Sequence, residues 1–300
     1  MYIDRNNFFV ISFLGLCTAF FVILMIALEV NATDWFGYKN ITINFSRPYF
    51  YQEYFSWWLI GSLRDLDERS YYISALIFFM LSWGAVYLLN SLSDGRNFRS
   101  LDYSVLFLLM FSNFFILLSV NGLRQGIALS LLMFSIGSRH KENLYFSYLF
   151  FVLSIFSHNS AILYLPLLIN HKYLKYIFQF VALIGVFFVW GLVGKSTGIT
   201  PNNNSLLFLL IALLLLFVLF QRKKWLSDGV FIVLVNLVLI VDQNTFERLM
   251  YYTIPLMLLY TVSSLKLKNY NFNFLLFIIV LMLDFLLWNT SSLKGVFDVI

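Results

Sequence analysis

Long apolar runs, broken at short intervals by charged, Gly, Pro or Asn residues, make up most of this 300-residue chain. A membrane-spanning helix needs about 20 apolar residues, so the longer runs predict such helices. The shorter neighbouring runs favour broken or re-entrant helices. The runs are Phe8–Val30, Tyr71–Ser91, Tyr103–Val120, Gly122–Ser138, Leu144–Ser157, Asn159–Asn170, Leu174–Gly194, Ser205–Gln221, Gly229–Val241, Arg248–Leu265 and Phe272–Trp288. The pattern predicts an all-α, polytopic integral membrane protein with about 10–11 transmembrane helices.

Composition excludes several other classes of protein. Hydrophobic residues make up 61% of the chain and charged residues 12%, against about 45–50% and about 25% in soluble domains. A soluble enzyme, a nucleic-acid-binding module and a disordered chain are therefore excluded. The single cysteine, Cys17, rules out an intramolecular disulfide. The first run is too long for a signal peptide, so we expect it to be a retained helix.

Basic residues predict the orientation, because cytoplasmic loops of membrane proteins are enriched in Lys and Arg. With a cytoplasmic N-terminus and one crossing per run, the inner loops hold 12 of the 20 basic residues. These are Arg5, Arg96, Arg99, Arg139, Lys141, Lys172, Lys175, Arg222, Lys223, Lys224, Lys266 and Lys268. The alternation requires a chain reversal at Ser157–Ser160. A single span over Leu144–Asn170 would move every later basic loop to the outside.

No linker or fixed-period repeat divides the chain, so residues 1–300 are predicted to form one polytopic membrane domain with an aromatic outer-face segment at 31–70. Within that segment, Tyr49–Ile60 has too many Tyr and Trp residues to cross a membrane. It is typical of an interfacial anchor helix. The alternative is a wall over an outer-face cavity, in which Tyr51 and Trp57 stack on sugar rings. Asp65 and Asp67 resemble a metal-binding D-x-D pair, but the motif is short and its predicted side is wrong for nucleotide sugars.

Ionisable groups near a bilayer are unfavourable unless they are paired or hydrated, so they mark candidate sites. Arg124 lies at the predicted start of a helix on the outer side, where the helix dipole repels a cation. An anion bound jointly by the guanidinium and the helix N–H groups would resolve this conflict. The alternative is an arginine that extends to the lipid headgroups. We therefore consider Arg124 a candidate phosphate-binding residue.

Two further residues fall on the same predicted face. His158 stands alone between apolar stretches and can exchange a proton near neutral pH, although a histidine hydrogen-bonded at a helix break is the alternative. Arg248 is a second candidate anion contact, or an interfacial arginine. Asp284 lies inside a predicted span and needs a partner there; the simplest interpretation is a hydrogen-bonded residue that fixes helix packing.

Three motifs together carry a family resemblance. They are Asn121–Ala128 (NGLRQGIA), Ser157–Ala161 (SHNSA) and Phe246–Tyr252 (FERLMYY). In this order and spacing, with Asp34, Tyr38 and Tyr51–Tyr54 in the outer segment, the chain resembles the EpsG-like branch of the bacterial Wzy polymerases.

That resemblance implies a fold of the membrane-embedded GT-C glycosyltransferase type. It implies an enzyme that joins oligosaccharide repeat units, carried on undecaprenyl diphosphate, on the outer leaflet of the bacterial inner membrane. The products would be O-antigen, capsule or exopolysaccharide, and no metal or other cofactor is expected. Membrane lipid and a chain-length regulator are the expected partners, without nucleic acid.

The resemblance also implies roles for individual residues. Arg124 and Arg248, with Gln125 beside Arg124, would bind the donor diphosphate. His158 would act as general base or orient the acceptor hydroxyl, and Asp34 is a second candidate base.

Two other functions fit parts of the pattern. A flippase of lipid-linked oligosaccharide would also use arginines near a diphosphate, but we expect internal repeats and polar residues through both leaflets in such a protein. A membrane acyltransferase acting on extracytoplasmic sugars would also use a histidine, but its acyl donor normally arrives from the cytoplasm. A non-catalytic assembly subunit is a further alternative.

Overall fold

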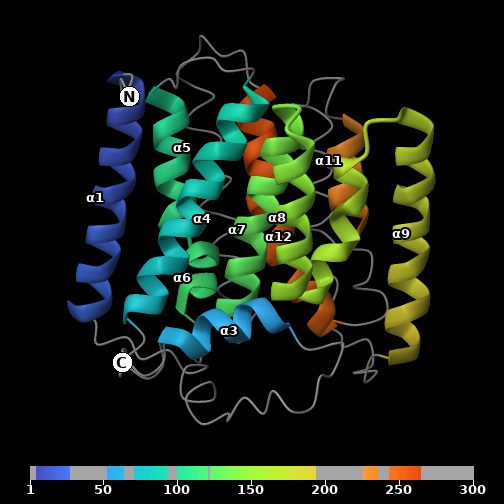
Figure 1. Ribbon diagram of the computed structural model, residues 1–300, viewed down its shortest axis with the longest axis horizontal. Coiled ribbons are helices and arrows are strands. Elements are labelled where there is room, and N and C mark those ends of the chain that lie inside the picture. Colours follow the sequence, from blue (N-terminus) through green and yellow to red (C-terminus); the bar gives the residue numbers. More distant parts are fainter. Residues whose placement is uncertain are drawn as a thin grey trace.

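Helices account for every regular element in the part of the chain that the computed structural model describes, residues 5–27, 53–63, 71–93, 100–120, 122–193, 226–235 and 243–264 (Figure 1). Within these ranges there is no strand, which confirms the all-α prediction. The elements are α1 (Arg5–Ala27), α3 (Tyr54–Leu63), α4 (Tyr71–Leu92), α5 (Ser100–Met110), α6 (Asn113–Val120), α7 (Leu123–His140), α8 (Leu144–Ser157), the 3₁₀ helix η2 (Asn159–Leu168), α9 (Lys172–Val193), α11 (Leu226–Leu234) and α12 (Gln243–Ser264).

The apolar runs of the sequence correspond closely to these helices. Of the described helices, α1 and α4 are long and apolar enough to cross a membrane. The run Tyr103–Val120 is instead divided into α5 and α6, which meet at a bend of 45° and together could form a third span. The runs Ser205–Gln221 and Phe272–Trp288 lie outside the described residues. The chain is a helical membrane protein, and the total of about 10–11 spans stays a prediction.

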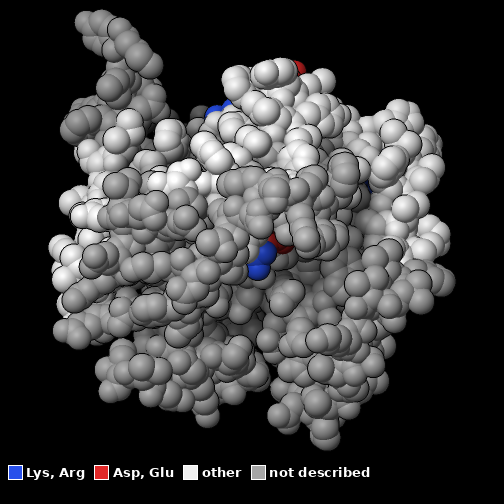
Figure 2. Space-filling view, turned by 60° about the horizontal axis from the view of Figure 1, so that its bottom comes forward, with Lys and Arg blue, Asp and Glu red and all other residues white. Residues whose placement is uncertain are grey.

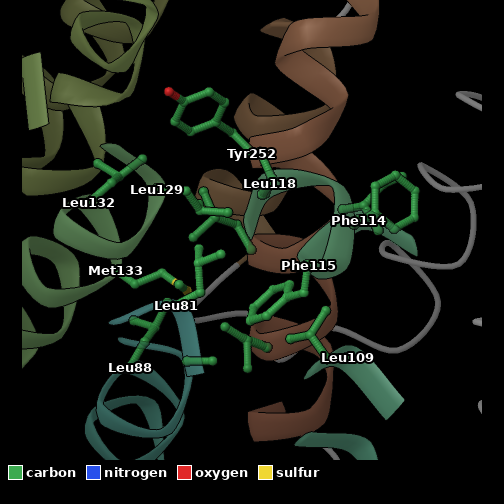
Figure 3. Packing of buried hydrophobic residues seen from close by; sticks show 14 of the residues in the cluster. Leu81, Leu88, Leu109, Phe114, Phe115, Leu118, Leu129, Leu132, Met133 and Tyr252 are labelled. Carbon is green, nitrogen blue, oxygen red and sulfur yellow. The ribbon is translucent and has the colours of Figure 1, made fainter. Parts of the chain in front are cut away.

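The core lies where α4, α6, α7 and α12 come together. Leu81 and Leu88 from α4 face Phe115 of α6 and Leu129 and Met133 of α7 in Figure 3, and all five side chains are buried. Tyr252 of α12 closes one side of this cluster (Figure 3). In lipid, helices associate through close van der Waals packing, since the hydrophobic effect gives no preference for a neighbouring helix over an acyl chain. The dense contact among these four helices therefore holds the bundle together.

Small residues allow α7 to approach its neighbours closely. A Cβ at Gly84 of α4 would stand 3.0 Å from the carbonyl oxygen of Ser130 in α7. A Cβ at Gly126 would stand 2.6 Å from the carbonyl oxygen of Leu118 in α6. Backbone atoms cannot move aside as a flexible side chain can, so these two positions require glycine for close packing.

Serine hydroxyls tie α7 to α8 across the helix interface. Ser154 donates to the carbonyl oxygen of Ala128 at 2.7 Å, and Ser135 donates to that of Ser147 at 2.8 Å. Such interhelical hydrogen bonds contribute about 0.6 kcal/mol each in a membrane. At the turn between the two helices, Glu142 adopts φ 61° and Asn143 caps α8 by accepting from the Phe146 N–H at 3.4 Å. The two helices therefore form a tight antiparallel pair.

The predicted reversal after Ser157 is confirmed, but the returning segment is a 3₁₀ helix. Ten residues at about 2.0 Å rise extend about as far as the fourteen residues of α8 at about 1.5 Å. The side chains repeat every third residue: Asn159 and Ile162 are exposed and Leu165 is half-buried, whereas the residues between them are buried. The carbonyl oxygen of Leu168, at the end of η2, accepts from Arg139 Nε at 2.6 Å. The segment therefore runs back along α7 to its C-terminal end.

Polar contacts at that end hold α9 against α11. Lys175 of α9 pairs with Asp228 in the first turn of α11, and Asp228 is buried. Gln179 and Ser227 are 3.4 Å apart and join the same two helices. The N-terminus of α1 and the start of α9 lie at this same end of the molecule (Figure 1). The chain segments that carry Arg5, Arg139 and Lys175, all predicted to be cytoplasmic, thus lie at one end of the molecule.

Replacing Gly126 with alanine tests the close packing of α7. We expect Gly126→Ala to destabilise the protein by about 1–3 kcal/mol, because the new methyl group meets a backbone carbonyl. Gly15→Ala is the matched control: a Cβ there would meet nothing within 4 Å, and alanine favours a helix. Thermal unfolding in detergent, followed by circular dichroism, measures both variants. Equal unfolding temperatures for the two would contradict the packing argument.

Candidate functional site

Four chain segments meet at the end of the bundle opposite the basic loops. Helix α3 lies across this end (Figure 1) and contacts α7 and α8. The start of α7, the end of α8 and the start of η2 lie beside it. Figure 2 turns this end forward, and basic and acidic atoms lie side by side near the centre of the view.

An ion pair between Arg124 and Glu53 lies at the centre of the cluster. Arg124 is the second residue of α7, and its Nη1 donates to Oε2 of Glu53, 71 residues earlier in the chain. Glu53 directly precedes α3, and its carbonyl oxygen accepts from the Trp57 N–H at 3.2 Å. An arginine at a helix N-terminus needs a nearby anion, because the helix dipole repels a cation there. In this structure Glu53 supplies that anion.

His158 lies on the other side of the same carboxylate. Its backbone is extended, with φ −158° and ψ 122°, so it ends α8 and begins η2. Nε2 is 3.7 Å from Oε1 of Glu53, and Nδ1 is 2.5 Å from the hydroxyl oxygen of Ser160. The break between the two helices thus positions the imidazole between a hydroxyl and a carboxylate.

The three charged or titratable side chains differ in exposure. The Glu53 and His158 side chains are 10% and 12% exposed, whereas Arg124 is 36% exposed. The Arg124 guanidinium also lies over the ring of Trp57, with 5.2 Å between its Cζ and the ring centroid. Such a cation–π contact orients the guanidinium plane. Of the three, Arg124 is the residue that an arriving ligand can reach most readily.

Ser56 fixes the geometry between α3 and α8. It is fully buried, and its hydroxyl lies 3.0 Å from the carbonyl oxygen of Glu53 and 2.9 Å from that of Ser157. Glu53 belongs to the cluster, and Ser157 directly precedes His158. One hydroxyl therefore holds the backbones that carry Glu53 and His158 beside each other before any ligand binds.

Helix α12 supplies the aromatic wall of the cluster. The ring of Tyr252 lies 6.2 Å from that of His158 and stacks on Tyr164 of η2 at 5.5 Å. Arg248 lies one helical turn before Tyr252 on the same face of α12. Its side chain lies outside the described residues, so its role as an anion contact stays a prediction.

The structure thus brings together three of the predicted site residues: Arg124, His158 and Trp57. Gln125 follows Arg124 in α7, and its side-chain oxygen lies over Gly122, 2.9 Å from an ideal Cβ there. Asp34, Tyr51 and Asp284 lie outside the described residues. Within the described ranges, no three His, Cys, Asp or Glu side chains gather as a metal site would require, and the metal independence of the reaction stays a prediction.

Glu53 is the residue of this cluster that the sequence does not single out as a candidate. The signal was nevertheless there, because Glu53 is the one charged residue in the aromatic stretch Tyr49–Ile60. A single carboxylate and a helix-terminal arginine on the same predicted face of a membrane protein are expected to pair.

The comparison with protein families decides the assignment. The model of the EpsG family matches residues 12–297. The chain belongs to the EpsG family. This family consists of Wzy-like polysaccharide polymerases, which confirms the resemblance drawn from the three motifs. No curated protein and no solved structure matches the chain significantly, so the likeness to GT-C transferases stays a prediction.

A double-mutant cycle tests whether the Glu53–Arg124 pair stabilises the fold. Arg124→Gln leaves the buried carboxylate without its nearest cation, so we expect it to lower the unfolding temperature more than the double variant Glu53→Gln/Arg124→Gln. The expected coupling energy is about 1–3 kcal/mol. Thermal unfolding of the four proteins in one detergent gives the cycle. Purely additive effects would show that the two side chains do not interact.

Proposed function

We propose that this EpsG-family protein polymerises oligosaccharide repeat units carried on undecaprenyl diphosphate, at the outer leaflet of the bacterial cytoplasmic membrane. Its products would be O-antigen, capsule or exopolysaccharide. The observation that carries the proposal is the convergence of Arg124 and His158, from separate helices, on one carboxylate at one end of the bundle. Anion binding and proton transfer at a single place are what glycosyl transfer from a lipid diphosphate requires.

Arg124 fits the donor side of this reaction. As the C1–O bond of the donor sugar breaks, negative charge develops on the leaving diphosphate and must be stabilised. A guanidinium has five N–H donors in a planar fork that matches phosphate oxygens, and the Arg124 side chain is 36% exposed. The N–H groups at the start of α7 add to the attraction. We expect Arg248 and Gln125 to complete the diphosphate site without a metal ion.

His158 fits the acceptor side. The acceptor sugar hydroxyl attacks C1 and loses its proton late in the step, so it needs a base and a group that orients it. His158 would serve in one of these roles, with Asp34 as a second candidate base. Trp57, already beside Arg124, and Tyr51 offer aromatic faces for sugar rings. The prenyl chain would remain in the surrounding lipid, and a chain-length regulator is a candidate partner.

Product analysis tests the proposed activity. Purified protein in detergent, incubated with lipid-linked repeat units from its own host, should yield a ladder of lengthened products. We expect Arg124→Ala to reduce the rate about 10²–10³-fold, because charge stabilisation at the leaving group is lost. His158→Ala should reduce it about 10²–10⁴-fold. If the wild type gives no ladder but translocates the lipid in vesicles, it is a flippase.

Cysteine labelling tests the orientation. In a Cys17→Ser background, Asn159→Cys lies at the end that carries Arg124 and His158, and Glu142→Cys lies at the opposite end among the basic residues. An impermeant maleimide should label Asn159→Cys in intact spheroplasts, and Glu142→Cys only after permeabilisation. The reverse pattern would move the site to the cytoplasmic face and exclude an outer-leaflet reaction.

A further inference from the structure

We infer that Ser160 is a positioning residue for the proposed reaction: its hydroxyl sets which edge of the His158 imidazole faces the Glu53 carboxylate. This inference rests on the proposed polymerase function, because it concerns the side chain to which that function assigns the acceptor hydroxyl. It begins from a contact of 2.5 Å between the Ser160 hydroxyl oxygen and Nδ1 of His158.

The shape of an imidazole ring does not by itself fix its orientation. Rotation about the Cβ–Cγ bond of a histidine has two broad preferred positions, about 180° apart. This rotation exchanges Nδ1 with Cδ2 and Nε2 with Cε1, so the ring fills almost the same space in both orientations. Packing therefore distinguishes the two only weakly. A hydrogen bond to one nitrogen distinguishes them strongly, because a ring C–H group cannot replace that nitrogen.

Both kinds of contact are present at His158. The ring of Tyr252 lies 6.2 Å from the imidazole, with 43° between the two planes, and such an aromatic contact restrains the plane of the imidazole but not its edge. The Ser160 hydroxyl meets the Nδ1 edge, and Nε2 then lies 3.7 Å from Oε1 of Glu53. In the rotated ring, Cε1 would take the place of Nε2 on the side of the carboxylate.

The local backbone brings the two side chains together. His158 has an extended backbone, and its carbonyl oxygen accepts from the Ala161 N–H at 3.0 Å. The chain therefore turns directly after His158, and Ser160 lies inside that turn. A serine two residues after the histidine is thus close enough for its short side chain to reach Nδ1.

Ser160 is itself held by packed neighbours. It is 5% exposed, so water has little access to replace its hydroxyl. Further along η2, Tyr164 is fully buried, stacks on Tyr252 and lies 3.4 Å from the Thr253 hydroxyl oxygen. A positioning group works best when packing also holds the element that carries it. Tyr252 thus packs on the imidazole and on the helix that carries Ser160.

The orientation of the ring matters for either role proposed for His158. A base must present a nitrogen lone pair, and a group that orients a hydroxyl must present an N–H or a lone pair. A ring carbon supplies neither. With Ser160 at Nδ1, each turnover would begin from the ring orientation that puts Nε2 on the side of Glu53 and Arg124. Such preorganisation lowers the barrier to proton transfer.

Kinetics of chain elongation test the inference. We expect Ser160→Ala to lower kcat about two- to tenfold, because the ring then divides its time between two orientations and moves more within each. KM for the lipid-linked repeat unit should change by less than about twofold, since Ser160 does not bind the donor. Ser160→Thr, which keeps the hydroxyl, should recover part of the rate.

A double-mutant cycle separates positioning from a structural role. If Ser160 acts through the imidazole, Ser160→Ala should have no further effect on elongation in a His158→Ala protein. Ser263→Ala is the matched control, because Ser263 is 1% exposed and donates to the Tyr260 carbonyl oxygen of its own helix at 2.7 Å. Losing that buried hydroxyl should leave the elongation rate unchanged.

Nitrogen NMR of histidine-labelled protein measures the contact without any assay of activity. The chain has three histidines, and the ring signals that disappear in His158→Gln identify those of His158. We expect Ser160→Ala to shift the Nδ1 signal of His158, because that nitrogen loses its hydrogen-bond partner at Ser160. Ser263→Ala should leave the signal in place.

The possible outcomes are distinct. The positioning role is overturned if Ser160→Ala elongates at the wild-type rate, or if it slows elongation equally with and without His158; the polymerase function then still stands. Unchanged His158 signals in Ser160→Ala overturn the role as well. If the wild type makes no ladder, the proposed function fails, and the histidine signals alone decide whether Ser160 orients the ring.

Discussion

A carboxylate buried at the end of an apolar helix bundle must be compensated locally, because neither lipid nor packed side chains can solvate it. Glu53 is that carboxylate, and the side chains around it compensate its charge. Arg124 supplies the opposite charge from the start of α7, and His158 approaches from the break between α8 and η2. Helix α3, which follows Glu53 directly, is joined to the same neighbours by Ser56 and Trp57. Removing the carboxylate would leave three chain segments without their shared contact.

Much of the fold follows from the alternation of apolar runs and charged interruptions. The runs place α1, α4, α7, α8 and α9 to within a few residues, since a membrane helix must hydrogen-bond internally over its whole length. Two features could not be found in this way. The bend between α5 and α6 lies at Ser112, whose hydroxyl oxygen accepts from the Phe115 N–H at 3.5 Å, and the length of the surrounding run hides this local signal. Helix η2 contacts α7, α8 and α9, and no local pattern reports those neighbours.

The candidate site was predictable in part, and for a specific reason. Charges are rare in this chain, so Arg124 and His158 stood out, and the topology placed them at one face. Arg124 at a helix N-terminus needs an anion, and in this structure Glu53, not a ligand, supplies it. Two residues 71 positions apart meet only through the tertiary fold. In a polymerase, the Glu53 carboxylate and the donor diphosphate would thus compete for the Arg124 guanidinium.

The threefold geometry of η2 restricts how this part of the chain can change in length. Each residue of a 3₁₀ helix turns the chain by about 120° and advances it by about 2 Å. Deleting one residue between Asn159 and Leu168 would therefore rotate a buried third of the segment outward, and would pull His158 out of line with Glu53. Only insertions or deletions of three residues restore the outward stripe, and each shifts the histidine by about 6 Å. The number of residues in η2 thus sets the distance between the Arg139 contact and the His158 imidazole. We therefore expect insertions and deletions among related chains to fall outside η2.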